Sequence, residues 1–528
     1  MADVGTPEAL TRSAARAGRQ YDAIPYPSYP IARLHPARLA AVAGLFGLAV
    51  PEVETARTLE IGCASGGHLI PLAAAFPQAR FLGIDVSANQ IASGRARINR
   101  LALANIDIET RSLAELRAAD GKFDFIVCHG VYSWIAEPMR EALMRVCKKH
   151  LASKGIAVIS FNVLPGWRMF QIVRDCAMAH ADARMDYAQR PAAARRLFDL
   201  LAKHTAEKTS YGNIWRTEAQ RMSKLGNAYL AHELFEQDSA PCTFSDFAAA
   251  ARRHGLGYLG ETDPAANIPE NSGLESGKVI RELSGDDFYR TEQYFDIVTG
   301  RTFRHALVGH ESWVGLADRS LPFERLDSLH LISSLDIKLT ESERRGQWSI
   351  SDGDSLIVTI GESAAAEAMR RLIARLPSSS NLGQIAPPGE IGEPGRSQIR
   401  AMLMQLVCSG SIACLSTPVI CAAGMPLKPK AWRLAASDAA AGMTHTATLR
   451  HAHYEISRLA GFLLPLADGS RDRQALVECL FELASGGGVQ ISEAGAPVTD
   501  KMRLKEICIT SVDKQIADFA RVGLLADE

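Results

Sequence analysis

The stretch TLEIGCASGGHLIPLA, residues 58–73, runs a short apolar segment into a cluster of small residues and then resumes with a helical pattern. Small residues cost backbone entropy on folding, so such a cluster indicates a place where a ligand comes close to the main chain. A strand ending near Glu60, a glycine-rich turn and a helix form the first half of a nucleotide-binding βαβ unit. The first N–H groups of the helix have no partner within the helix, so they are available to bind a ligand at such a site.

The segments around this stretch alternate between strand and helix patterns. Apolar runs that predict short buried strands occupy residues 57–61, 80–85, 106–110, 123–129 and 155–161. The stretches between them have helical spacing. This alternation is typical of an α/β fold with a doubly wound parallel sheet, and near-continuous apolar runs fit strands that are buried on both faces.

The pattern changes after the fifth predicted strand. Residues 168 to about 240 are helical throughout, and 244–254 form a further helix. Residues 255–261 and 302–310 predict two more strands. We interpret residues 166–242 as a helical insertion and the two later strands as the completion of the same sheet.

Beyond residue 315 the signals are weaker. Residues 434–444, LAASDAAAGMT, have low complexity and predict a linker. This linker would separate a middle domain, 316–433, from a C-terminal domain, 434–528.

Composition excludes several function classes. The 528 residues are 47% hydrophobic and 22% charged with a formal net charge of −1, as in ordinary globular proteins, so no basic field calls for nucleic acid. The ten cysteines form no CxxC pair, which predicts reduced thiols and no metal site. The N-terminus lacks the apolar core of a signal peptide, and the longest apolar run, 39–50, is too short to span a bilayer. We expect a soluble cytoplasmic protein without membrane insertion.

The glycine-rich loop suggests which ligand is bound. It reads acidic-x-Gly-x-Ala-x-Gly from Glu60 to Gly66, whereas dinucleotide sites read G-x-G-x-x-G. Glu60 would repel a phosphate but could accept a hydrogen bond from an ammonium group. Asp85 ends the next strand and is placed to accept bonds from a ribose diol. The pair suits S-adenosylmethionine. NAD, for which Asp85 would serve equally, and a turn used only for helix packing remain as alternatives.

The chain resembles class I S-adenosylmethionine-dependent methyltransferases. More specifically, it is similar to bacterial protein lysine methyltransferases with a methyltransferase regulatory domain, a family known for methylating lysines of outer-membrane proteins. The resemblance is strong to about residue 310. The similar stretches are residues 21–31, 35–48, 59–73, 83–94, 123–135, 159–168, 228–236, 252–261 and 292–310.

The resemblance implies a set of functional residues. The implied cofactor-binding residues are Glu60, Gly62, Ala64, Ser65, Gly66 and Asp85, with His129 and Gly130 on the adenine and methyl side. Ser112 stands where many methyltransferases have an acidic residue near the adenine, and we keep it as a candidate. His68 departs from the Asn expected in relatives. The resemblance also implies that the helical insertion dimerises and that the tail carries winged-helix-like α+β modules.

These patterns together predict five domains. They are an S-adenosylmethionine-binding methyltransferase core (1–165), the helical dimerisation or regulatory insertion (166–242), the completion of the sheet (243–315), the middle domain (316–433) and the winged-helix-like domain (434–528).

Methylation of a lysine requires a neutral amine. From a pKa of about 10.4, removing the proton costs roughly 4–5 kcal/mol at pH 7. Aromatic walls exclude water and still tolerate a cation. Tyr132 and Trp134 follow the fourth strand, and Asn162 at the end of the fifth could offer its carbonyl to an amine. Tyr21 and Tyr26 lie in an N-terminal segment that could cover the substrate. Ordinary packing remains the alternative for these aromatic residues.

Three functions fit these observations. The first is a homodimeric protein lysine N-methyltransferase whose C-terminal modules present the polypeptide substrate. The second is a small-molecule N- or O-methyltransferase with a regulatory tail. The third is a non-catalytic, cofactor-sensing interaction protein. Residues 440–528 hold nine Lys and Arg against twelve Asp and Glu, which favours contacts with protein over DNA.

Overall fold

A mixed β-sheet forms the centre of the first part of the protein. In the computed structural model, which describes residues 7–181, 185–285, 287–342, 344, 346–361, 363–493 and 496–527, this sheet has the strand order β3-β2-β1-β4-β5-β7-β6. Strands β1 to β5 run parallel, and β7 is antiparallel to both of its neighbours. The strands are β1 (Arg57–Ile61), β2 (Arg80–Asp85), β3 (Ile106–Thr110), β4 (Phe123–Cys128), β5 (Leu151–Asn162), β6 (Leu256–Glu261) and β7 (Phe303–His310).

These strands confirm the α/β fold that the sequence predicts. All seven predicted strand segments take part in one sheet, and the two late ones complete it through β7 and β6. The sheet is not wholly parallel, because β7 enters antiparallel beside β5, as in the class I methyltransferase fold. Burial on both faces explains the continuous apolar runs, since β4 and most of β5 are inaccessible to solvent.

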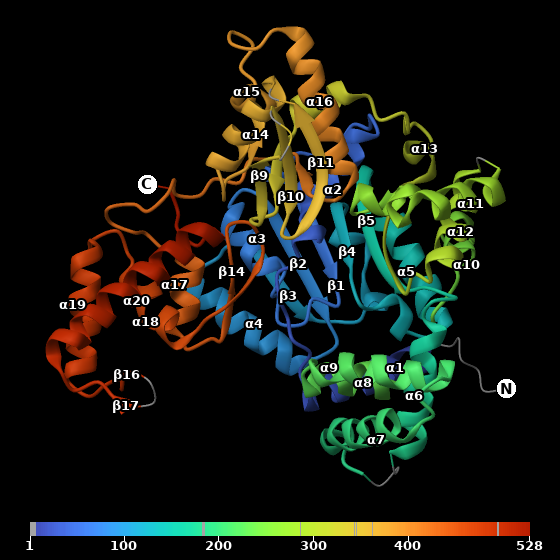
Figure 1. Ribbon diagram of the computed structural model, residues 1–528. Helices are drawn as coiled ribbons and strands as arrows, with labels where there is room; N and C mark the ends of the chain where they lie inside the picture. The colour runs from blue at the N-terminus through green and yellow to red at the C-terminus, as the bar shows by residue number, and fades with distance from the viewer. Residues whose placement is uncertain are drawn as a thin grey trace. The chain divides into compact units, whose positions relative to one another are not determined.

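Helices accompany the sheet. They are α1 (Pro7–Ala23), α3 (Leu69–Ala75), α4 (Ala88–Leu101), α5 (Glu137–His150), α6 (Arg168–His180), α7 (Arg190–His204), α8 (Ser210–Ser223), α9 (Asn227–Phe235), α10 (Phe244–Arg253), α11 (Leu274–Ser284), α12 (Phe288–Thr299) and α13 (Glu311–Val314). Ser87 caps α4, since its Oγ accepts a hydrogen bond from the main-chain N–H of Gln90 at 3.3 Å. Figure 1 shows α1, α8 and α9 close together beyond one end of the strands.

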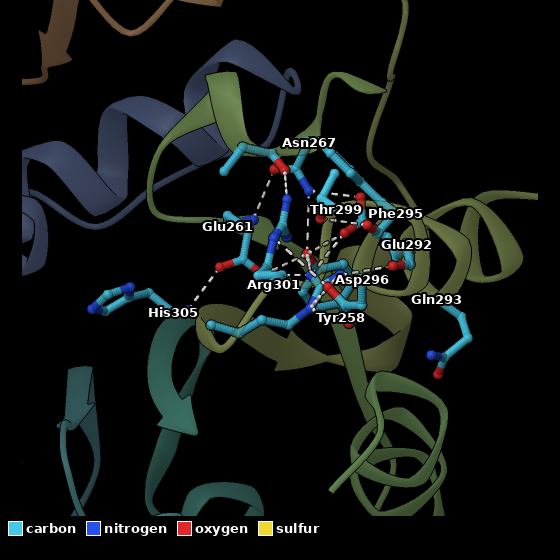
Figure 2. A network of polar contacts seen from close by, with 12 residues as sticks. Tyr258, Glu261, Asn267, Glu292, Gln293, Phe295, Asp296, Thr299, Arg301 and His305 are labelled. Carbon is cyan, nitrogen blue, oxygen red and sulfur yellow. Dashed lines mark hydrogen bonds and ion pairs between the residues drawn. The ribbon is translucent and has the colours of Figure 1, made fainter. Parts of the chain in front are cut away.

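A buried charge network fastens the antiparallel edge of this sheet (Figure 2). Arg304 on β7 is 0% exposed and forms ion pairs with Glu261 on β6 and with Glu292 and Asp296 on α12, at 2.7–2.8 Å. Burial raises the pKa of Asp296 to about 6 even though Arg304 opposes the shift. The network therefore holds β6, β7 and α12 together through one fully buried guanidinium.

The described residues fall into two units, which we treat separately. The sheet unit takes the described residues up to Ser28 together with Phe46–Asn99 and Leu103–Arg319. The second unit takes Tyr29–Leu45, Arg100–Ala102 and the described residues from Ser320 onward. The five predicted domain boundaries remain predictions.

The second unit combines small antiparallel sheets with helices. Its core joins α2, from the N-terminal part of the chain, to α14 and α16, with Ala41 and Leu45 of α2 in one apolar cluster with Leu403 and Val407. The strands are β8 (His330–Ser333), β9 (Ile337–Glu341), β10 (Gln347–Asp352), β11 (Ser355–Gly361), β12 (Ser380–Asn381), β13 (Ile412–Leu415), β14 (His445–Ala447), β15 (His453–Glu455), β16 (Ser492–Glu493) and β17 (Ala496–Pro497). The helices are α2 (Pro36–Leu45), α14 (Ala364–Ala374), α15 (Leu382–Ile385), α16 (Glu393–Cys408), α17 (Arg433–Ala440), α18 (Arg458–Leu466), α19 (Arg473–Ser485) and α20 (Lys501–Val522).

The predicted linker at 434–444 is wrong. Most of it is α17, which contacts α18 and buries Ala435 and Asp438 completely. Thr446 donates a hydrogen bond to the buried Asp438 carboxylate at 2.7 Å. The alanines that give this segment its low sequence complexity allow α17 to pack closely against α18.

Candidate active site

The loop after β1 consists of small residues, and its main chain at Gly62 and Ala64 lies against a cavity. Gly62 has φ +80°, and a Cβ atom there would lie 2.5 Å from Cγ2 of Val131, so no other residue fits without displacing a neighbour. The Gly62 N–H donates to the Ile84 carbonyl at 2.8 Å, which ties the loop to the end of β2. Ala64 also has a positive φ, 50°. The sequence places small residues here because the backbone turns sharply under a cavity.

Asp85, at the carboxyl end of β2, holds this loop in place. Its Oδ2 accepts the N–H of Ala64 and its Oδ1 accepts the N–H of Ser87, both at 2.8 Å. Burial raises the pKa of the Asp85 carboxyl, and these two main-chain bonds oppose the shift. Each carboxylate oxygen still has room for a further donor. Asp85 is thus a preorganised acceptor that lines the cavity.

Glu60 is a second carboxylate close to the loop. Its side chain is buried, with the residue 5% exposed, and Oε2 has no hydrogen-bond partner among the described residues. Burial first, and the charge of Asp85 second, raise the pKa of Glu60 to about 8. Unlike Ile61 and Gly62, Glu60 is not among the residues that line the cavity. An unpaired buried carboxylate of this kind is stabilised by a cation such as an ammonium group.

A cavity of about 440 Å³ lies at the carboxyl ends of the parallel strands, the edge where α/β sheets bind ligands. The end of β1, the end of β2 and the residues after β4 and β5 line one part of it. Helix α1 and the segment around α9 line the rest. The residues of this second part include Ala14, Ala17, Tyr21, Arg221, Tyr229, His232, Glu233, Glu236 and Asp238.

Most of the site residues predicted from the sequence line this cavity. They are Gly62, Ala64, Asp85, Ser112, His129, Gly130, Trp134, Asn162, Tyr21 and Tyr26. The His129 ring stacks on the His305 ring at 5.3 Å. Trp134 meets Trp167 edge to face at 6.4 Å, so two indoles form one wall. Ser112 uses its hydroxyl to cap a short 3₁₀ helix, since it accepts the Ala114 N–H.

Four predicted residues do not line the cavity. Glu60 lies just behind it, and the main chain of Ser65 packs against α4 at Gly94. The backbone at Gly66 packs against Ile70. Tyr132 is buried in the core between Phe161 and Phe247, with ring centroids at 6.0 and 5.4 Å. We therefore remove Tyr132 from the candidate site, because its ring is needed to pack η5 (Tyr132–Trp134) against β5 and α10.

The face of α9 was missed in the sequence. Tyr229, His232, Glu233 and Glu236 follow the spacing i, i+3, i+4, i+7, which places them on one side of a helix. The Tyr21 ring stacks on His232 at 4.2 Å, and His232 Nε2 lies 2.7 Å from the Ile24 carbonyl oxygen. The signal was a helical face that carries aromatic and acidic groups, inside a segment interpreted as a dimerisation insertion.

Helix α1 is fastened over the cavity by charged side chains. Asp22 accepts hydrogen bonds from Ser87 Oγ at 2.6 Å and from the Asn89 N–H at 3.0 Å, at the start of α4. Arg16 pairs with Asp238 at 2.5 Å and donates to Gln237 at 2.9 Å. The N-terminal segment therefore forms part of the cavity wall, and the role of Tyr21 and Tyr26 toward a substrate stays a prediction.

Several buried polar atoms of cavity-lining residues lack hydrogen-bond partners among the described residues. They are Nδ2 of Asn162, Nε1 of Trp167, Nδ1 of His232 and Oε2 of Glu236. Buried polar groups are nearly always satisfied in native proteins. The orphaned Glu60 carboxylate and the acceptor Asp85 fit a ligand that has an ammonium group at one end and a ribose at the other. The described residues contain no group of three or more side chains that could hold a metal ion.

Three family models match separate segments of the chain. A methyltransferase domain covers residues 58–155, a predicted methyltransferase regulatory domain covers 226–310, and the C-terminal winged helix domain of PKMT covers 428–524. The regulatory model includes α9 and the strands β6 and β7. No helix of the described chain has the length and apolar character needed to cross a membrane.

One curated relative and one solved structure match almost the whole chain. An uncharacterised protein of Rickettsia prowazekii is 29% identical over 96% of this chain and 93% of its own length. A second one, from the same strain, is 33% identical over 44% of this chain and 94% of its own length. The solved structure of PKMT2 from Rickettsia typhi is 26% identical and covers 95% of this chain and 100% of that chain, with a TM-score of 0.83.

PKMT2 has also been solved in complex with AdoHcy, with the same TM-score and coverage. AdoHcy is S-adenosylmethionine without its transferable methyl group. Together with the loop after β1, the acceptor Asp85 and the orphaned carboxylate of Glu60, this identifies S-adenosylmethionine as the cofactor. The chain belongs to the bacterial S-adenosylmethionine-dependent methyltransferases that carry a methyltransferase regulatory domain and a PKMT C-terminal winged helix domain.

Proposed function

We propose that this chain is a protein lysine N-methyltransferase. The observation that carries the proposal is the similarity to PKMT2, a protein lysine methyltransferase, over 95% of this chain, with the C-terminal winged helix domain included. A small-molecule enzyme would need only the sheet unit. The trans-aconitate 2-methyltransferase of Deinococcus radiodurans, a small-molecule enzyme by name, aligns over only 21% of this chain.

The proposed cofactor site follows from the geometry of the loop and the two carboxylates. Gly62 and Ala64 would lie against the cofactor, Asp85 would accept from the ribose, and Glu60 would balance the ammonium group. His129, Gly130 and Ser112 would lie beside the rest of the nucleoside. When bound, S-adenosylmethionine supplies a methyl group on a positively charged sulfur, already activated for transfer. The protein must align a neutral amine and exclude water.

Trp134 and Asn162 are the residues that we propose for the acceptor amine. The main-chain N–H of Asn162 donates to Ser133 Oγ at 2.8 Å, which fixes the end of β5 against η5 and so fixes both side chains. The Trp134–Trp167 wall excludes water without repelling a cation. Tyr21 and Tyr26, held by α1 and the segment after it, would close the other side.

We further infer that the substrate is a protein, with lysines of outer-membrane proteins first to be tested because of the family resemblance. We also infer a homodimer formed through residues 166–242. In its support, this segment exposes Met169, Met178 and Leu200, apolar side chains more typical of an interface than of free surface.

The test is methyl transfer to protein. Purified enzyme and methyl-labelled S-adenosylmethionine are incubated with a detergent-solubilised envelope fraction of a Gram-negative bacterium, and proteins are digested and sequenced by mass spectrometry. The proposal expects one or more methyl groups on lysine side chains, and little label with Asp85→Asn. Turnover that labels only small molecules would favour the metabolite enzyme, and binding without turnover would favour a cofactor sensor.

A further inference from the structure

The wall of the cavity formed by α9 is chemically different from the cofactor loop. Tyr229, His232, Glu233 and Glu236 all line the cavity from one helical face. None of them belongs to the loop after β1 or to β2, which carry the proposed cofactor contacts. Two carboxylates and a tyrosine, in a cavity that the indoles of Trp134 and Trp167 also line, are suited to a cationic ligand with an apolar stem.

Glu236 directly follows α9 and carries the clearest sign of an unseen partner. The residue is 2% exposed, its Oε1 accepts the Gln237 N–H at 3.0 Å, and its Oε2 has no hydrogen-bond partner among the described residues. Burial raises the pKa of this carboxyl. A buried carboxylate oxygen is costly without a donor, so this atom calls for a donor or a cation from a ligand.

Glu233 lies one turn earlier and is already engaged. Its carboxylate is hydrogen-bonded to the Tyr229 side chain, and burial raises its pKa to about 7. Its carboxylate is a second acidic group that lines the cavity, and its backbone carbonyl accepts a bond from Arg174 at 2.8 Å. The two carboxylates therefore differ, because Glu233 has a local partner and Glu236 has a free oxygen.

The charged groups around these carboxylates come from four elements. They are Arg16 on α1, Arg174 on α6, Arg221 on α8, Tyr187 in the 3₁₀ turn before α7, and Asp238 just after α9. The arginines are committed elsewhere, Arg16 to Asp238 and Arg221 to Glu218, while Arg174 lies over the Trp134 ring. Within the described residues, neither Glu233 nor Glu236 forms an ion pair with an arginine.

We propose that Glu236, supported by Glu233, is the subsite that receives the ammonium of the substrate lysine and takes its proton. This rests on the proposed function. An N–H bond of the substrate ammonium breaks, an O–H bond forms on Glu236 Oε2, and the electron pair stays on the lysine Nζ, which is then a neutral nucleophile. The proton passes to water after the product leaves. Glu236 would be a catalytic residue because it contacts the substrate, and Glu233 is a second carboxylate that lines the same cavity.

The test compares single-turnover rates of methyl transfer to envelope-protein lysines across pH. Wild-type enzyme binds the ammonium form, so its rate should change less than threefold from pH 8 to 9.5. Glu236→Gln has no proton acceptor and depends on amine that is already neutral. Its rate should be at least 30-fold lower at pH 7. It should then rise about 300-fold by pH 9.5, as the neutral fraction of an amine of pKa about 10.4 does.

Two further variants separate this role from a structural one. Glu236→Asp keeps a carboxylate and should keep the flat profile at a reduced rate. Glu207→Gln, an exposed glutamate of the same helical segment, should match the wild type in rate and in profile. AdoHcy affinity, measured by calorimetry, should change less than threefold in Glu236→Gln, because the cofactor loop is untouched.

The possible results are distinguishable. A Glu236→Gln profile parallel to that of the wild type overturns the subsite, whatever the size of the rate loss. If Glu236→Gln does not fold, a wild-type rate that rises tenfold per pH unit up to pH 9.5 overturns it. Wild-type enzyme that methylates no lysine, yet binds AdoHcy, contradicts the proposed function itself and the subsite with it.

Discussion

Two carboxylates at neighbouring strands, Asp85 and Glu60, are held in different ways by the main chain. Asp85 accepts two N–H bonds, whereas Oε2 of Glu60 accepts none from the described residues. A carboxylate that accepts hydrogen bonds from the main chain is held in one orientation. A buried carboxylate without hydrogen-bond donors is stabilised when a cation binds beside it. The ribose contact and the ammonium contact of the cofactor are therefore expected to respond differently to substitution.

Asp85→Asn should weaken AdoHcy binding about 10- to 100-fold. A hydrogen bond to a charged group contributes roughly 1.5–3 kcal/mol, and the amide replaces one acceptor oxygen by a donor. Calorimetry gives the affinity directly. Asp107→Asn, at an exposed position on β3, is the matched control and should bind like the wild type. Equal affinities for the two variants would remove Asp85 from the site.

Glu60 should make AdoHcy binding pH-dependent. Its pKa is raised to about 8 in the free protein, and an ammonium partner would lower it, so binding near pH 6.5 should release about one proton. Affinity should then rise by up to about tenfold per pH unit from pH 5.5 to 7.5. Calorimetry in buffers of different ionisation enthalpy counts the proton, and Glu60→Gln should release none from this site.

The same shift has a consequence for stability without ligand. Because the folded-state pKa of Glu60 lies above the unfolded value of about 4.5, the folded protein binds more protons between about pH 4.5 and 8. The contribution of Glu60 to the free energy of unfolding therefore falls as the pH rises through this window. Glu60→Gln should lose less stability than the wild type between pH 5 and 8; an equal loss would contradict the shift.

At the residue scale, the sequence predicts the parts of the site that depend on chain order. The small residues after Glu60 and the position of Asp85 at a strand end follow from local pattern alone. Tyr132 and Glu236 do not, because their environment is set by packing between distant segments. Nothing near Tyr132 in the sequence indicates that Phe247 covers it, or that α9 turns its polar face toward β5.

At the scale of elements, the helical segment α6–α9 contributes to two different surfaces of the protein. Its α9 face completes the cavity, while Met169, Met178 and Leu200 are exposed on α6 and α7. The same segment therefore lines the cavity and carries the apolar surface of the proposed dimer. Its apolar residues at helical spacing predict helices, but not which polar face is inward.

The charge network at the antiparallel edge should stabilise the fold strongly. Arg304→Met leaves three carboxylates near one another without their shared cation, which typically costs about 3–5 kcal/mol. Thermal unfolding should show a clear decrease in Tm for this variant. Arg290→Met, at an exposed position of α12, should change Tm little. Similar Tm values for both variants would show that the network does not stabilise the fold.

Element boundaries could be predicted where one pattern dominates, as in β1, β2 and β3. The helix at 434–444 could not be predicted, because an alanine-rich composition fits two different structures. Small side chains suit a solvated linker, and they also suit a helix that packs closely against another, as α17 does against α18. Only the partner helix decides between them, and it lies later in the chain.

At the scale of the whole molecule, the chain passes repeatedly between its two units. Residues Tyr29–Leu45 belong to the second unit although the segments on either side of them belong to the sheet unit. The sequence does not indicate this, because α2 is apolar on nearly all sides and would fit any core. Each unit is therefore built from several separate segments of the chain, and not from one continuous stretch.

The proposed dimer is a prediction about the assembled molecule. Leu200 is 57% exposed on α7, so Leu200→Glu should place a charge in the interface and shift sedimentation equilibrium from dimer to monomer. Leu316→Glu carries the same charge at a site that is 74% exposed outside this segment and should leave the dimer intact. A monomeric wild-type protein would contradict the dimer, and an unaffected Leu200→Glu dimer would place its interface elsewhere.

The membership of α2 in the second unit has a consequence for biosynthesis. Its buried residues Ala41 and Leu45 are synthesised early. Their partner Leu403 on α16 follows more than 350 residues later in the chain. During that interval this apolar helix lacks the partners that bury it, so the nascent chain is expected to expose apolar surface. A transcript cut short before α16 would yield a polypeptide prone to aggregate and to be degraded.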